Sequence, residues 1–74
     1  MMQEGDIITN CDGIVAMLDR FDFRKDSGQV FKTLYYDNIV SFGRHATFRA
    51  EGVRFANKEE VKKFLSKLES YVNR

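Results

Sequence analysis

The chain is short of several residue types, and each shortage excludes a class of protein. Its 74 residues include no proline, one cysteine (Cys11) and one histidine (His45). A single cysteine cannot form an intrachain disulfide, so the chain is not a disulfide-stapled mini-protein. One cysteine and one histidine also fall short of the four Cys or His ligands of a structural zinc site. We therefore expect no metal and no cofactor, and a fold that is stabilised by packing.

Long apolar stretches are missing as well. The longest run, residues 14–18, is far shorter than the roughly 20 residues that a membrane-spanning helix needs. The first residues, Met1 to Asp6, are acidic and lack the basic start and apolar stretch of a secretory signal. We therefore expect a cytoplasmic protein that does not engage a membrane.

The length of the chain leaves room for one domain. Its composition is 43% hydrophobic and 31% charged, which is too apolar for a disordered chain. A chain of this length hides only about 60% of its unfolded surface, so a second copy would add stability. We expect residues 1–74 to form a single domain that assembles as a homodimer.

Charge is nearly balanced overall but unevenly distributed. The net charge is +1, which excludes bulk polycationic attraction to nucleic acid. Residues 1–22 carry a net charge of −4, residues 23–49 of +3 and residues 50–74 of +2. Any charge-driven function must therefore use the basic part of the chain that follows the acidic start.

Hydrophobic residues recur at helical spacing near the C-terminus. They are Val61, Phe64, Leu65, Leu68 and Val72. This spacing places them on one stripe and predicts an amphipathic helix over residues 58–72. Asn57 is the expected N-cap, and Glu60 stands where it can reach back to the cap as in a capping box.

Between Gln29 and Phe55 the pattern is that of strands. Branched and aromatic residues predict strands at 30–36, 39–42, 46–49 and 53–55, with turn formers around them. Gly43 is expected to be a break or a bulge. The short connections favour antiparallel neighbours over βαβ crossovers.

Residues 13–21 fit two patterns, a short helix capped by Asp12 and a strand. We favour the strand, because the adjacent Ile14 and Val15 are poor starters of a helix. The sequence therefore predicts an α+β domain, in which an antiparallel meander of about four strands is followed by a C-terminal amphipathic helix.

Aromatic residues and cations interleave from Phe42 to Arg49 and again at Arg54-Phe55. Such surfaces suit single-stranded nucleic acid, because bases stack on the rings and Arg or Lys binds the phosphates. The expected phosphate-binding residues are Arg24, Lys25, Lys32, Arg44, Arg49 and Arg54, and the expected stacking residues are Tyr35 and Phe48.

The same residues have plainer interpretations. The interleaved segment also fits the solvated face of a half-buried sheet, and His45 fits a surface histidine. The aspartates at positions 12, 19, 22 and 26 match no metal-binding loop, although a small nuclease would need them to converge on a metal. No nucleophile or phosphate-loop motif is present, so we do not expect an enzyme.

The stripe on the C-terminal helix has two interpretations. It packs on the chain's own sheet, or it also meets a second copy. In the second case the expected dimer-interface residues are Phe64, Leu68, Tyr71 and Val72.

Aromatic and basic strands are followed by Gly52-Val53-Arg54-Phe55 and by a helix that opens with Asn57-Lys58-Glu59-Glu60. This order resembles the single-stranded DNA-binding transcriptional coactivators of the positive cofactor four type, over residues 29–72. The resemblance implies a curved four-stranded sheet followed by a helix, dimerisation through the helices, and binding of unpaired DNA along the sheet. It places Arg49 in the family's basic stretch and Tyr35-Tyr36 at the end of its second strand, whereas Ala50-Glu51 replaces a basic pair.

We therefore expect a homodimeric protein that binds single-stranded DNA or RNA with little sequence specificity, in transcription or replication. The alternative is a small protein-interaction or inhibitor module, pleckstrin-homology-like or phage-encoded. Its sheet edge or its acidic N-terminal region would bind a host protein.

Overall fold

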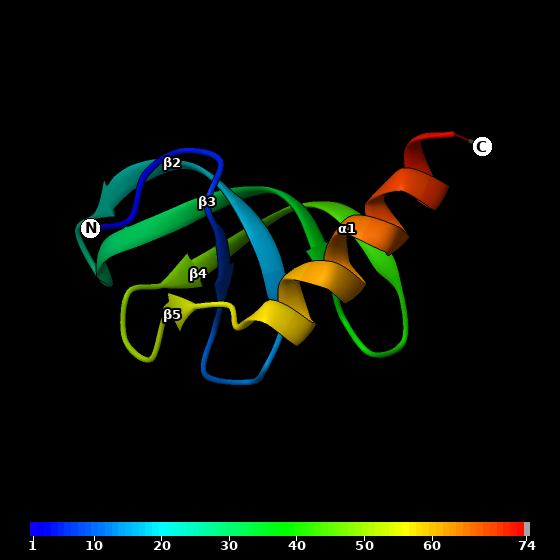
Figure 1. The fold of residues 1–74 in the computed structure, drawn as a ribbon. Helices are drawn as coiled ribbons and strands as arrows, with labels where there is room; N and C mark the ends of the chain where they lie inside the picture. The colour runs from blue at the N-terminus through cyan, green and yellow to red at the C-terminus, as the bar shows by residue number, and fades with distance from the viewer. Residues whose placement is uncertain (74) are drawn as a thin grey trace.

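The computed structural model describes residues 1–73, which form one antiparallel sheet and one helix (Figure 1). The elements in chain order are β1 (Ile7–Thr9), β2 (Val15–Arg24), β3 (Gly28–Asp37), β4 (Phe42–Arg49), β5 (Arg54–Phe55) and α1 (Lys58–Val72). The predicted α+β class is confirmed, as is the meander followed by a C-terminal helix. The strand predicted within residues 13–21 is also confirmed, as the first part of β2.

The order of strands in the sheet is β4-β3-β2-β1-β5. β1 to β4 follow one another as a meander, but β5 crosses to the far edge and pairs with β1. In a flat sheet those two edges would lie about 19 Å apart. The connection from β4 to β5, residues 50–53, is closed by a bond from the Val53 N–H to the Ala50 carbonyl (3.2 Å) and cannot span that distance. The sheet must therefore curl, as Figure 1 shows.

Strand boundaries between Asp37 and Arg49 differ from the predicted ones. Phe42 and the strand expected at 46–49 belong to one strand, β4, and Gly43 lies inside it without a break. Gly43 faces Tyr36 in register, and a Cβ atom at Gly43 would lie 2.8 Å from the Tyr36 ring. Glycine is thus needed here to admit a ring, and the predicted bulge is wrong.

Residues 39 and 40 form the tip of a turn instead of the start of a strand. Asn38 and Ser41 exchange backbone hydrogen bonds of 2.9 and 3.0 Å, which leaves Ile39 and Val40 at the tip with their side chains almost fully exposed. The prediction of a strand over 39–42 is therefore wrong except at Phe42. The short strand β1 was not predicted at all.

The inner face of the curled sheet carries the main hydrophobic core. Its buried members come from four strands: Ile8, Ala16, Leu18, Phe31 and Phe48. Two register shifts between β2 and β3, on either side of Leu18, keep these side chains on one face. Thr33 is buried beside them, and its Oγ1 accepts a hydrogen bond from the Ala46 N–H (3.1 Å), next to a left-handed His45 (φ 61°).

α1 covers the other face of the sheet at one end. Phe42 is adjacent in sequence to Gly43 and therefore points away from the main core. Its ring lies 5.5 Å from that of Phe64 and 5.2 Å from that of Tyr71, measured between centroids, and Phe64 is completely buried. On the same face Lys67 Nζ lies 3.0 Å from Asp37 Oδ1. This end of the sheet is therefore enclosed between the main core and the helix.

The helix begins and ends where the sequence predicted. The Asn57 side chain accepts from the Glu60 N–H (2.8 Å), and the Asn57 N–H donates to Glu60 Oε1 (2.9 Å), so the predicted capping box is confirmed. The buried side of the helix is narrower than the predicted stripe, because Leu65 and Val72 are exposed.

The contact between α1 and Phe42 predicts a difference between two adjacent helix residues. Phe64→Ala is expected to lower the free energy of unfolding by about 3–5 kcal/mol, because it empties a fully enclosed site. Leu65→Ala is expected to lower it by no more than about 1 kcal/mol, because that side chain is 47% exposed. Urea unfolding followed by circular dichroism measures both. Equal losses would show that α1 docks through a different face.

Candidate functional site

β2, β3 and β4 carry basic side chains on the outer face of the sheet, opposite the main core. The register pairs Arg20 with Lys32 and Lys32 with Thr47, and directly paired residues share a face. Residues two positions apart along a strand also point to the same face. We call this surface the basic face; its members are Arg20, Arg24, Lys32, His45 and Arg49. Asp22, between Arg20 and Arg24, also lies on it.

A shallow cavity of about 220 Å³ lies in the centre of the basic face. It is lined by Asp19, Arg20, Lys32, Thr33, His45, Ala46 and Thr47. Lys32 Nζ donates to Thr47 Oγ1 (3.1 Å), and Arg20 Nη1 lies 3.3 Å from Asp19 Oδ2. Two cations, an imidazole and a hydroxyl thus converge from three strands, a donor set that suits a phosphate. A phosphate at Arg20 would have to compete with the Asp19 carboxylate, which lines the same cavity.

The predicted phosphate-binding residues do not all gather at this place. Lys32 and Arg49 lie on the basic face, and Arg24 ends β2 with Lys25 in the turn that follows. Arg44 is exposed and is paired in register with Tyr35 rather than with the basic face. Arg54 binds Glu60 with both terminal nitrogens, at 2.9 and 3.0 Å, so a phosphate would have to compete with a carboxylate there.

Of the two predicted stacking residues, Phe48 is buried, whereas Tyr35 is half-buried and partly engaged within the chain. Phe48 is 3% exposed and belongs to the main core, so its predicted role in stacking is wrong. Tyr35 is half-buried; its ring is stacked on Phe42 at 6.2 Å and meets Tyr71 at 6.0 Å.

The exposed aromatic residues are others, which the sequence reasoning missed. Phe21 and Phe23, in the second half of β2, are 43% and 72% exposed. Phe21 touches the ring of Phe31 edge-on at 5.1 Å. Both point to the side of the sheet opposite the basic face, so rings and cations alternate across β2. The sequence signal was the alternation in Arg20-Phe21-Asp22-Phe23-Arg24.

The predicted dimer interface on the helix is largely used within the chain. Phe64 is completely buried against Phe42, and Leu68 and Tyr71 are half-buried. The prediction that Phe64 meets a second copy is therefore wrong. Of the four expected interface residues, Val72 is the exposed one.

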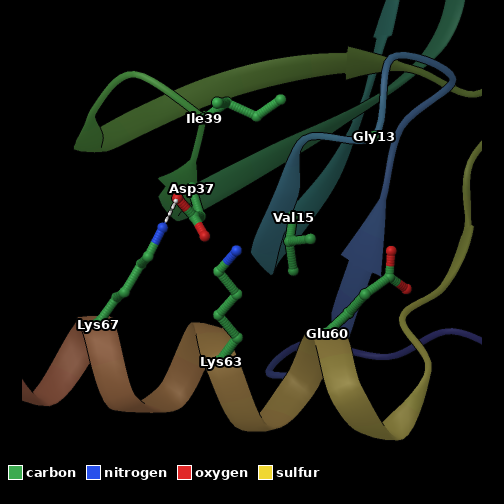
Figure 2. A pocket seen from close by; sticks show the side chains of 7 residues that line it. All are labelled: Gly13, Val15, Asp37, Ile39, Glu60, Lys63 and Lys67. Atoms are coloured by element: carbon green, nitrogen blue, oxygen red, sulfur yellow. Dashed lines mark hydrogen bonds and ion pairs between the residues drawn. The ribbon is translucent and has the colours of Figure 1, made fainter.

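A second cavity, of about 210 Å³, lies between α1 and the sheet (Figure 2). Gly13, Val15, Asp37, Ile39, Glu60, Lys63 and Lys67 line it. Lys67 forms the ion pair with Asp37, and Lys63 points into the cavity from the next turn of the helix (Figure 2). Cations and carboxylates alternate around it, which gives the cavity no dominant charge.

The carboxyl group of Glu60, which lines this cavity, has a pKa below its ordinary value. The Arg54 guanidinium donates to it, and so does the backbone N–H of Asn57; together they lower the pKa of the Glu60 carboxyl from 4.5 to about 2. The same pair raises the pKa of Arg54 above its ordinary value. The charges hold β5 to the start of α1.

Two further properties of residues 1–73 bear on function. No group of three or more His, Cys, Asp or Glu side chains within them could hold a metal ion. No helix formed by these residues is both long enough and apolar enough to cross a bilayer.

Comparison with known proteins gives no relative: no protein-family model, curated protein or solved structure matches the chain. The resemblance to the positive cofactor four type therefore stays a prediction.

The lowered pKa of Glu60 predicts how stability depends on pH. Ionised Glu60 stabilises the fold fully above the ordinary pKa of 4.5, and this contribution is lost as the pH falls towards about 2. Glu60→Gln keeps an oxygen for the Asn57 N–H but removes the charge, so its unfolding free energy should fall less steeply between pH 5 and pH 2. Glu59→Gln, an exposed neighbour, is the matched control and should follow the parent chain. Parallel curves for all three proteins would refute the assignment.

Proposed function

We propose that the protein binds single-stranded nucleic acid through the phosphate backbone, with little sequence specificity, and that the basic face is the binding surface. The observation that supports this most is the register that places Arg20, Lys32 and Arg49 on one face of three adjacent strands. These three cations lie on adjacent strands of the meander, and the pairing of the strands brings them to one face.

The chemistry of the basic face accounts for low specificity. Contacts from Arg and Lys to phosphates position a nucleic acid but do not read its sequence. Phe48, which was expected to stack on bases, is buried, and the half-buried ring of Tyr35 is stacked on Phe42. The exposed rings of Phe21 and Phe23 point to the opposite side of the sheet, so the basic face itself offers contacts to phosphates rather than to bases.

A second candidate function, a protein-interaction module, is favoured by one observation. Ile39 and Val40 are 97% and 90% exposed at the tip of the β3–β4 turn, beside the cavity that α1 forms with the sheet. Two adjacent apolar side chains exposed to this extent offer apolar area that a protein partner would cover. A partner captured from lysate that resists nuclease treatment and is lost in Ile39→Ser/Val40→Ser would support this function.

Binding through the basic face predicts a characteristic dependence on salt. A fluorescent oligothymidine is titrated at several salt concentrations with the parent chain, Arg49→Ala and Lys62→Ala. Each phosphate contact contributes about −0.7 to the slope of log K against log salt for a single strand. Arg49→Ala should weaken binding and flatten the slope by about that amount.

The helix residue Lys62 supplies the control, because it carries the same charge, is exposed and lies outside the basic face. Lys62→Ala should leave the slope unchanged. Absence of binding in low salt would refute the proposed function, and equal effects of the two substitutions would move the site away from the basic face.

A further inference from the structure

The second half of β2 has one free edge. β1 pairs with β2 only over Val15–Met17, and the last backbone bonds on that side are those of Leu18 with Gly5 and Asp6, both 2.8 Å. Among residues 1–73, no strand lies beside residues 19–24 on the side away from β3. A free edge of this kind is a template for another strand.

The backbone of Phe21 and Phe23 faces this edge. The Phe23 N–H donates to the carboxylate of Asp22 at 2.8 Å instead of to β3. Backbone groups of alternate residues point to the same side of a strand, so those of Phe21 face the edge too. Asp22 therefore occupies the edge in the single chain, as charged residues do where natural proteins protect an unpaired strand.

Exposed apolar side chains accompany the free edge. Phe21, Phe23 and Met1 are exposed on the inner side of β2, and a cavity of about 420 Å³ lies there between Met1, Met2, Phe21, Gln29 and Phe31. No other part of the single chain within residues 1–73 covers these exposed apolar side chains, which form a large cluster for a chain of 74 residues.

The sequence along the edge is complementary to itself. If two copies of β2 pair antiparallel about a two-fold axis at Phe21, Arg20 lies opposite the partner's Asp22. The symmetry repeats this pair in reverse, and Phe21 lies opposite the partner's Phe21. The pairing ends at Asp19, where β2 already carries a register shift.

Neighbouring registers are less favourable. An axis at Asp22 would place Asp22 opposite the partner's Asp22 and Arg20 opposite the partner's Arg24, and like charges directly opposite each other are destabilising. A shift by one residue would turn phenylalanines towards the charged face. An axis at Phe23 would also set Asp22 opposite the partner's Arg24, but β2 ends at Arg24, so only residues 22–24 of each strand would pair. The axis at Phe21 pairs residues 19–23 of each strand and is therefore the favoured register.

We propose that the protein forms a homodimer by pairing the free edges of β2 in this register, with a second copy of the chain as the occupant. The interface consists of main-chain hydrogen bonds at Phe21, two reciprocal Arg20–Asp22 pairs on the outer side, and the phenylalanines with Met1 and Met2 on the inner side. This proposal does not depend on the proposed binding of nucleic acid.

A charge swap tests the pairing. Solution mass is measured by light scattering over a range of concentrations, with circular dichroism to verify folding. The parent chain should show twice the 8.6 kDa of one copy. Asp22→Arg sets arginines opposite each other and should weaken the dimer at least tenfold; the double variant Arg20→Asp/Asp22→Arg restores opposite charges and should dimerise again.

The swap also has outcomes that would overturn the proposal. These are a parent chain that is monomeric at every concentration, a folded double variant that stays monomeric, and an Asp22→Arg variant that dimerises as well as the parent.

Cross-linking tests the register independently. In a Cys11→Ser background, which removes the exposed native thiol, Phe21→Cys places two thiols across the axis with Cα atoms about 5.5 Å apart, within the reach of a disulfide. Phe23→Cys lies opposite the partner's Asp19 and should cross-link at least tenfold less under the same mild oxidation. Equal cross-linking at positions 21 and 23, or none at 21, would overturn the register.

Discussion

The short connection between β4 and β5 is the constraint on which the rest of the structure depends. Four residues, 50–53, must join strands that lie at opposite edges of a five-stranded sheet. The sheet meets this demand by curling, and the curl creates an inner face that can be filled by a few large side chains. It also fixes where α1 begins, because Asn57 follows β5 directly and directs the helix across one end of the sheet.

Strand alternation then separates the chemistry of the two faces. Along β4, Phe48 turns inward while Thr47 and Arg49 turn outward. Along β2 the same alternation sends Phe21 and Phe23 to one side and the arginines to the other. A surface that looks mixed in the sequence is therefore two surfaces, one cationic and one apolar, which meet at the free edge of β2 and along the outer edge of β4.

The sequence predicted well those features that depend on neighbours along the chain. The bounds of α1 and its capping box follow from local spacing and capping chemistry. Gly43 was misread, because its role depends on the ring of Tyr36 in another strand. The strand predicted at Ile39 and Val40 was wrong, because branched residues usually indicate a strand, whereas here they lie at the tip of a turn.

The candidate site was harder to predict than the fold. Alternation alone could separate Arg49 from Phe48 within one strand, but that Lys32 shares a face with Arg49 depends on the register between β3 and β4. Which face is buried depends on the register shifts between β2 and β3. Arg20 belongs to the basic face only because β2 lies beside β3, and the exposure of Phe23 depends on the length of β1. The order and pairing of the strands join residues that are far apart in the sequence, so no pattern of neighbouring residues predicts them.

The enclosure of one sheet end between two apolar layers has a consequence for local stability. Ala16 and Tyr36 lie in register there, with core on one side and α1 on the other, whereas Arg24 and Gly28 pair far from both. Local opening of a backbone amide requires loss of the packing around it. In a single copy of the chain, amide hydrogen exchange should therefore slow progressively from the tip of the β2–β3 hairpin towards the helix. The same sheet thus combines a rigid end with an end that opens readily.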